Sequence, residues 1–533
     1  MSTSADIIIG IDSGTSVVKA VAFDTAGRQL GTGAVRNAVD QGADGAATQS
    51  LDQTWRDCAA ALRQLAEAVP DLATRACALA VTAQGDGTWL VGQGGRPVGP
   101  AWTWLDARAA PTVARLAATD ADAARFRATG TGLNTCQQGA QMAHMDRHAP
   151  DLLDRAATAL HCKDWLYLQF TGVRATDPSE ASFTFGDFRT RAYDDTVLDA
   201  LGLAHRRALL PPILDGTTTH HPLTAEAAAA TGLPAGLPVV LGYVDMVMTA
   251  LGAGVHTGEA GSACSAIGST GVHLRAVRAE AVHLNDARTG YVICLPVPGM
   301  VTQVQTNMAA TLNIDWLLGI VAELAASFGA PQDHAALVAR IDDWLTRSAP
   351  AELVYLPYIS EAGERGPFVN ADARAAFLGL SQKVGFAAML RAVVEGLALA
   401  ARDCYAAMGA LPSELRLSGG AAQSQALRAI FADVMDRPVR VSARREAGAT
   451  GAAMMAAVSI GAWADMGACI DAWVRPELGP LEHPDPARVA LHAAQRNSYG
   501  TARGALVPVW DAMAAQRAPR ASRHQPAQKE TVQ

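Results

Sequence analysis

The sequence has few charged and few aromatic residues, which excludes several classes of protein. Only 18% of its 533 residues are charged and 5% are aromatic, whereas half are apolar. The formal net charge of -8 argues against a basic surface that binds nucleic acid or anionic membranes. We therefore expect an enzyme acting on small molecules, with neither nucleic acid nor membrane as a partner.

The sequence also lacks the cysteine patterns of disulfide-rich and zinc proteins. Its eight cysteines form no CxxC pair and no Cys/His array with zinc spacing, so we expect reduced core thiols. The start, MSTSADIII, has neither the basic region nor the long apolar stretch of a signal peptide. The uncharged run Ala447 to Ala464 is mostly Ala and Gly, which favours a buried helix over a membrane span. Together these absences predict a cytoplasmic protein.

No Walker A motif, GxxxxGK[ST], occurs, which argues against a P-loop nucleotide site. Two other glycine-bearing turns are present instead. Ile7 to Phe23, IIIGIDSGTSVVKAVAF, predicts two strands joined by Asp12-Ser-Gly-Thr15, and Ser265 to Val272, SAIGSTGV, repeats the pattern around Gly268 to Gly271. Such turns expose backbone N–H groups to phosphate, and Asp12 suits Mg²⁺. Each turn alone could be an ordinary hairpin, but the pair suggests two related domains facing one nucleotide.

Strand-like and helix-like segments alternate along the chain, the pattern of α/β architecture. The segments that organise the prediction are a capping box at Ser50 to Gln53, a strand at Ala78 to Thr82, a helix at Leu152 to Phe170, a strand at Pro238 to Gly242, a helix at Phe386 to Met408 and a strand at Leu415 to Leu417. We place a domain junction in the Gly-rich stretch 252–261 and expect domains at 1–252 and 253–490. An extension follows at 491–533, disordered after about residue 516.

Nine motifs in order carry a family resemblance. They are Asp12-Ser-Gly-Thr15, the Gln84 segment, Trp104-x-Asp106-x-Arg108, Lys163-Asp-Trp165, Thr176-Asp177-x-Ser179-x-x-Ser182, Asp245, Gly268-Ser-Thr-Gly271, Gly363-Glu-Arg365-x-Pro367 and Ser418-Gly-Gly-Ala421-x-x-Ser424. Over residues 6 to 480 the chain resembles the FGGY carbohydrate kinases, and within them the sugar-alcohol kinases. The resemblance implies two actin/hexokinase-like (ribonuclease H-like) domains with a nucleotide cleft between them.

The same resemblance implies an ATP- and Mg²⁺-dependent kinase and assigns roles to residues. Asp245 is the expected general base, although its local sequence alone favours a helix cap. Mg²⁺ is assigned to Asp12 and Asp245. The ATP phosphates are assigned to Ser13, Gly14, Thr15, Gly268, Ser269, Thr270 and Gly271, and the adenine side to Gly419, Gly420, Ala421 and Ser424.

The expected acceptor is a small polyol, with erythritol as the first choice and a pentulose or pentitol (xylulose, ribulose or xylitol) as the alternative. Substrate contacts are assigned to Gln84, Gly85, Asp86, Trp104, Asp245 and Met246. Trp89 and Trp102 are candidates either for the pocket or for the core. A nucleotide-dependent regulatory protein without turnover and a sugar-independent ATPase are the alternatives from other classes, and the resemblance allows a homodimer.

Overall fold

The computed structural model describes residues 5–256 and 261–521. The chain divides into two compact units built from interleaved segments. Unit 1 comprises Met1–Cys264, Leu274–Val304 and Ser442–Gly479, and unit 2 comprises Ser265–His273, Gln305–Val441 and Pro480–Gln533. These units do not follow the boundaries 1–252, 253–490 and 491–533, which stay a prediction for the domains. Part of the expected junction, 257–260, lies outside the described residues.

Unit 1 is organised around a six-stranded sheet in the order β12-β13-β6-β1-β2-β3. Its strands are β12 (His221–Pro222), β13 (Pro238–Leu241), β6 (Ala76–Ala83), β1 (Ile7–Ser13), β2 (Val17–Asp24) and β3 (Gln29–Arg36). Strands β1 and β2 form the predicted antiparallel hairpin, β3 adds a further antiparallel strand to β2, and β6 runs parallel to both β1 and β13. The fully buried run of isoleucines in β1 fits a central strand covered on both faces.

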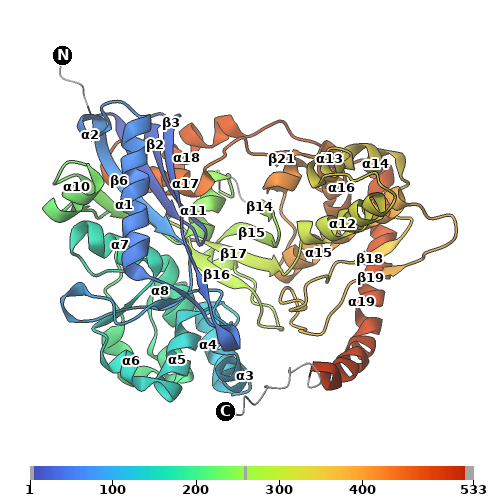
Figure 1. The fold of residues 1–533 in the computed structure, drawn as a ribbon, viewed down its shortest axis with the longest axis horizontal. Helices are drawn as coiled ribbons and strands as arrows, with labels where there is room; N and C mark the ends of the chain where they lie inside the picture. Colours follow the sequence, from blue (N-terminus) through green and yellow to red (C-terminus); the bar gives the residue numbers. More distant parts are fainter. Residues whose placement is uncertain (1–4, 257–260, 522–533) are drawn as a thin grey trace, which may run out of the picture. The chain divides into compact units, whose positions relative to one another are not determined.

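Helices cover both faces of this sheet. Helix α1 (Leu51–Ala68) runs along β2 and β3 (Figure 1), and its apolar face joins Ile7, Ile9 and Ile11 in one core. On the other face lies α17 (Ala447–Ser459), packed on β1 and on α11 (Asp245–Gly252). A Cβ on Gly10 would stand 2.0 Å from the carbonyl oxygen of Ala449, so only glycine permits this approach. Residues 447–459 of the uncharged run thus form a buried helix, as predicted, whereas residues 460–464 lie beyond its end.

The remaining helices of unit 1 lie between strands in the sequence, except α18, which follows the last strand. They are α2 (Leu72–Arg75), α3 (Ala110–Ala117), α4 (Ala121–Thr129), α5 (Gln138–His148), α6 (Pro150–Asp154), α7 (Cys162–Thr171), α8 (Pro178–Phe185), α9 (Asp195–Leu201), α10 (Ala225–Thr231) and α18 (Met466–Trp473). The prediction of one helix over 152–170 is wrong. Strand β9 (Thr158–Leu160) interrupts it and pairs with β7 (Trp89–Val91), a long-range pairing that overrides the local helical pattern.

A second sheet has six strands in the order β16-β17-β15-β14-β20-β21. They are β16 (Tyr291–Cys294), β17 (Met300–Asn307), β15 (Gly271–Arg278), β14 (Ser262–Ile267), β20 (Glu414–Ser418) and β21 (Val439–Val441). Unit 2 contains the ends of β14, β15 and β17 next to the Gly268 to Gly271 turn, together with β20 and β21. The second hairpin predicted from the sequence is therefore present as β14-turn-β15.

The helices of unit 2 include the long α15 (Phe386–Ala407) and α19 (Pro486–Ala521). The others are α12 (Thr311–Ser327), α13 (His334–Val338), α14 (Ile341–Arg347) and α16 (Gln425–Met435), beside the short pair β18 (Val354–Leu356) and β19 (Ala376–Leu378). The expectation of disorder from about residue 516 is corrected for 516–521, which continue α19. Residues 522–533 of the expected tail lie outside the described residues.

Candidate functional site

The carboxyl ends of three neighbouring parallel strands carry the predicted residues of unit 1. Asp12 lies near the end of β1, Gln84 directly follows β6, and Asp245 follows β13 as the first residue of α11. Because β1, β6 and β13 run in the same direction, these residues meet at one edge of the sheet. That edge is where open α/β sheets bind ligands.

The carboxylate of Asp245 is held by backbone N–H groups from the start of α11 and from the segment after β6. Its Oδ1 accepts a hydrogen bond of 2.6 Å from the N–H of Met246, and the backbone of Gly85 also bonds to this carboxylate. Burial and the neighbouring charge of Asp12 raise the pKa of Asp245 to about 7. A carboxyl group with a pKa near neutrality is suited to accept a proton from a substrate hydroxyl.

Asp12 lies against the beginning of α17. A Cβ on Gly448 would stand 2.2 Å from Asp12 Oδ2, so the missing side chain makes room for the carboxylate. Burial raises the pKa of Asp12 to about 6, Lys19 opposes this rise and Glu446 adds to it. Lys19 itself pairs with Glu446 at 2.8 Å. Sequence reasoning missed Glu446 and Gly448, whose only signal was the Gly-rich run that indicated a buried helix.

Thr15 connects the first turn to the predicted polyol residues. Its Oγ1 donates to Gln84 Oε1 at 2.9 Å and accepts from Trp104 Nε1 at 2.8 Å. Gln84 Nε2 in turn donates to Gln49 Oε1 at 2.7 Å. The hydroxyl of Ser13 faces inward, 3.9 Å from the sulfur of Cys162. The turn thus presents Gly14 and Thr15, while the Ser13 side chain belongs to the core.

Of the three candidate tryptophans, only Trp104 is exposed, at 38% of its surface. Trp89 and Trp102 are buried in the core. The guanidinium of Arg108 stacks on the Trp102 ring at 3.5 Å and pairs with the fully buried Asp106 at 2.5 Å. Asp106 and Arg108 of the Trp104-x-Asp106-x-Arg108 motif thus pair with one another and shape the loop that carries Trp104.

Gly85 and Asp86 adopt a conformation that the packing requires. A Cβ on Gly85 would lie 2.4 Å from Val244 Cγ2 and 3.3 Å from Glu180 Oε1. Asp86 has a left-handed backbone, with φ of 57°. Its negative charge raises the pKa of both Asp245 and Glu180. The packing of Val244 and Glu180 around position 85 therefore leaves room only for glycine.

A buried group of charged side chains lies close enough to Asp86 for the Asp86 charge to act on one of them, Glu180. Lys163 Nζ pairs with Asp164 at 2.6 Å and with Asp177 at 2.5 Å, and all three side chains are fully buried. His161 Nε2 lies 3.4 Å from Glu180 Oε2. Burial raises the pKa of Glu180 well above its usual range. Lys163, Asp164 and Asp177 belong to two of the nine sequence motifs, but the sequence did not predict that they form one cluster.

In unit 2 the Gly268 to Gly271 turn and the Gly419 segment are neighbours. The N–H of Gly268 donates to the carbonyl of Thr270 at 3.1 Å, which closes the turn. Gly419 has φ of 90°, and a Cβ there would stand 2.6 Å from the carbonyl oxygen of Ile267. The glycine thus lets the loop after β20 approach the strand that leads into the turn.

Ser424 is the N-cap of α16. Its Oγ accepts from the N–H of Leu427 at 3.1 Å and donates to Asp342. Gly420 and Ala421 precede it in a short 3₁₀ turn, and a Cβ on Gly420 would meet open space. The Ser424 hydroxyl is committed to capping, so its assignment to ATP stays a prediction.

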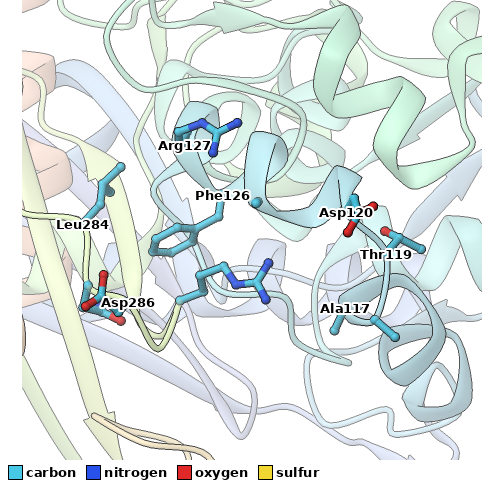
Figure 2. A pocket seen from close by; sticks show the side chains of 11 residues that line it. Ala117, Thr119, Asp120, Phe126, Arg127, Leu284 and Asp286 are labelled. Carbon is cyan, nitrogen blue, oxygen red and sulfur yellow. The ribbon is translucent and has the colours of Figure 1, made fainter.

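A separate hollow of about 580 Å³ lies between α3, α4 and the loop 284–288 (Figure 2). Its charged lining residues carry both signs: Asp120, Asp286, Arg127 and Arg288. The predicted site residues are not among those that line it. We therefore do not assign the hollow to the candidate site.

Across 5–256 and 261–521, no helix is long and apolar enough to span a membrane. In the same described residues, no group of three or more His, Cys, Asp or Glu side chains could hold a metal ion. Asp12 and Asp245 are instead a pair of partly buried carboxylates, and the charge of Asp12 acts on Asp245. All eight cysteines are free thiols, as predicted.

Comparison with known proteins gives two matching family models. The N-terminal domain of the FGGY family of carbohydrate kinases matches residues 7–252, and the C-terminal domain of that family matches residues 263–460.

Individual relatives match over almost the whole chain. The erythritol kinase of Brucella abortus is 64% identical over 514 residues, covering 96% of this chain and 99% of the relative. The xylulose kinase of Escherichia coli is 28% identical, covering 94% and 99%. Among solved structures, xylulose kinase from Rhodospirillum rubrum superposes with a TM-score of 0.84 at 28% identity, covering 95% of this chain and 100% of that one.

Proposed function

Since the chain belongs to the FGGY family of carbohydrate kinases, we propose that it transfers the γ-phosphoryl group of ATP to a hydroxyl group of erythritol. The observation that carries the choice of acceptor is the extensive identity to the Brucella abortus erythritol kinase. The free thiols of all eight cysteines support a reducing, cytoplasmic setting for this enzyme.

Asp245 is the proposed general base. The ionised carboxylate accepts the proton of the attacking hydroxyl as the bond to phosphorus forms, a contribution worth about 10² to 10⁴ in rate. Its position at the first turn of α11 and its pKa near 7 support this role. The hydrogen bond from the N–H of Met246 keeps the carboxylate oriented.

Asp12 and Asp245 are the proposed ligands of Mg²⁺. Burial raises the pKa of both carboxyl groups, and the charge of Asp12 raises that of Asp245 further. A bound divalent cation would offset this cost of burying negative charge. When bound beside ATP, Mg²⁺ neutralises charge on the phosphate oxygens.

The proposed phosphate contacts are the backbone groups of the two glycine-bearing turns. In unit 1 these are the turn residues Gly14 and Thr15, with Ser13 contributing backbone only. In unit 2 they are Ser269, Thr270 and Gly271, while Gly268 shapes the turn, because its N–H bonds to Thr270 and its carbonyl to Thr311. Gly419, Gly420 and Ala421 are proposed to line the adenine ring, because a loop of small residues lets backbone approach a flat base closely.

The proposed polyol pocket contains Gln84, Gly85, Asp86, Trp104 and Met246. The hydrogen bonds of Thr15 with Gln84 and Trp104 support this assignment, because they join the phosphate turn to the polyol residues in one unit. Asp86 offers a carboxylate that can accept from two hydroxyl groups. The exposed indole of Trp104 offers an apolar face to the C–H side of a polyol.

The test is ADP release from Mg·ATP with erythritol, threitol, xylitol, ribitol, glycerol, xylulose and ribulose, beside a reaction without acceptor. We expect erythritol to stimulate release most strongly. Stronger stimulation by a five-carbon acceptor would contradict the proposed substrate. Release that no acceptor changes would instead favour a sugar-independent ATPase.

A further inference from the structure

The Gly268 to Gly271 turn is anchored to the segment that follows β17. The carbonyl of Ser269 accepts a hydrogen bond of 2.7 Å from the N–H of Ala310, and the carbonyl of Gly268 accepts one of 2.9 Å from the N–H of Thr311. The carbonyls of these two turn residues are therefore engaged by the segment after β17. The position of the turn thus depends on the position of residues 307–311, here called the support segment.

The first residue of the support segment, Asn307, is fixed by a directional chain of buried hydrogen bonds. Asn307 Nδ2 donates to the carbonyl of Gly366 at 2.8 Å, so Oδ1 is the acceptor for His273 Nε2 at 2.9 Å. Nδ1, the other ring nitrogen of His273, lies 2.9 Å from Ser265 Oγ, which lies 2.9 Å from Tyr405 OH. Burial lowers the pKa of His273 to about 4, so the ring is neutral with its proton on Nε2, and Nδ1 is left to accept from Ser265.

His273 also lies directly beneath the turn. A Cβ on Gly271 would stand 3.1 Å from His273 Nε2 and 3.5 Å from Asn307 Oδ1. The side chains of Ser265, His273 and Asn307 are all almost completely buried. The backbone at the end of the turn therefore rests on a rigid pair of polar side chains that solvent does not reach.

Glu364 fixes the second residue of the support segment. Its Oε1 accepts from the N–H of Met308 at 3.0 Å, of Arg365 at 2.9 Å and of Gly366 at 3.4 Å. Arg365 Nε donates to Thr306 Oγ1 at 2.9 Å. Residues of the Gly363-Glu-Arg365 motif therefore bond to the neighbours of Asn307 on both sides, Thr306 and Met308.

We propose that His273 and Glu364 are positioning residues that hold the Gly268 to Gly271 turn in the shape that binds the ATP phosphates. The inference rests on the proposed role of this turn. His273 acts through Asn307 and Gly271, and Glu364 acts through Met308. Both side chains are almost completely buried, so they act on the turn from within the protein. A well-packed turn binds phosphate without first being ordered, so loosening it lowers nucleotide affinity.

The experiment measures binding of Mg·ADP and Mg·ATP by calorimetry on the full chain, without acceptor, beside the KM values for ATP and polyol. For His273→Leu and Glu364→Ala we expect nucleotide Kd and KM for ATP to rise about ten-fold, the loss expected from one or two buried hydrogen bonds. The KM for the polyol should stay within about two-fold, since unit 1 carries the proposed polyol pocket.

Conservative variants separate positioning from folding. Glu364→Gln keeps the Oε1 acceptor, and the Oε2 it replaces has no hydrogen-bond partner within the described part of the chain. His273→Gln keeps a donor toward Asn307. Both are expected to retain nucleotide Kd within about three-fold of the wild type, because the bonds that hold the support segment persist. If His273→Gln and Glu364→Gln lose as much nucleotide affinity as His273→Leu and Glu364→Ala, the proposal is overturned.

A matched control is His492→Leu. His492 is equally buried in unit 2 and bonds to Gln495 Oε1 at 2.9 Å, but it belongs to α19. This variant should lower the melting temperature as His273→Leu does and leave nucleotide Kd unchanged. If His273→Leu melts like the control and binds nucleotide like the wild type, the proposal is overturned. If the wild type binds nucleotide but phosphorylates no polyol, the proposed substrate is contradicted. The binding test of His273 and Glu364 still applies, because it requires no turnover.

Discussion

Asp245 has the environment of a base rather than that of a simple helix cap. A capping aspartate is normally stabilised in its charged form by the helix N-terminus. In this protein, burial of the carboxyl group and the charge of Asp12 outweigh that stabilisation, so the pKa of Asp245 rises to about 7. The local sequence alone favoured a cap, and the difference comes from Asp12, a residue 233 positions away that sequence periodicity does not place beside it.

Asp245→Asn should abolish most turnover and keep ATP binding. Asparagine has a similar shape but accepts no proton, so kcat should fall by about 10² to 10⁴. Steady-state kinetics together with ATP binding by calorimetry measure both effects. A kcat near that of the wild type would remove Asp245 from the mechanism.

Gly85→Ala should disturb the polyol pocket by steric overlap with Val244. The added Cβ would stand 2.4 Å from Val244 Cγ2, and overpacking of this kind costs about 1 to 3 kcal/mol. We expect a raised KM for the polyol and a lowered melting temperature. Adding Val244→Ala should bring both the KM and the melting temperature part of the way back to the wild-type values. A double variant with the same KM and melting temperature as Gly85→Ala would refute the steric explanation.

Among the elements, the hairpins and the strand-turn-helix segments were predictable because their signals are local. The turns at Asp12 and Gly268, the capping serine Ser50 and the strand before Asp245 all have the expected structure. The segment 152–170 was not predictable, because β9 exists only through its pairing with β7. Equally, Gly448 beside Asp12 and Glu180 behind Asp86 result from packing of distant segments, which no local pattern encodes.

His273, in strand β15, should make the protein less stable toward unfolding as the pH falls. Burial lowers the pKa of His273 from 6.5 to about 4. The unfolded chain therefore takes up this proton below pH 6.5 and the folded chain only below about pH 4, so stability is lost as pH falls through that window. At about 1.4 kcal/mol per pH unit, the loss is roughly 3 kcal/mol.

Denaturant unfolding of the wild type and His273→Gln at several pH values measures this effect. Glutamine does not titrate, so the stability difference between the two proteins should shrink by roughly 3 kcal/mol between about pH 7 and pH 4. Parallel stability profiles across this range would show that His273 does not carry the acid sensitivity.

At the scale of the whole molecule, the last turns of α19 differ in how they pack on the rest of unit 2. Trp510 is buried, lies edge-on to Tyr358 at 5.7 Å and donates to the carbonyl of Arg374 at 3.1 Å. Arg517 makes only a partly exposed ion pair with Asp372 at 3.3 Å, an interaction worth little in water.

A chain that ends at Gln516 should therefore keep its melting temperature and its KM values. A chain that ends at Ala505 loses Trp510 and should be destabilised by about 3 to 5 kcal/mol. Thermal unfolding and steady-state kinetics of both truncations check this. A large rise in KM for the chain ending at Gln516 would give the last residues a function that this account does not include.

The most direct test of the central claim is identification of the product by mass spectrometry. The protein is incubated with Mg·ATP and erythritol, with Asp245→Asn as the blank. We predict erythritol monophosphate in amounts equal to the ADP formed, and almost none with the variant. ADP that accumulates without any phosphorylated erythritol would contradict the account.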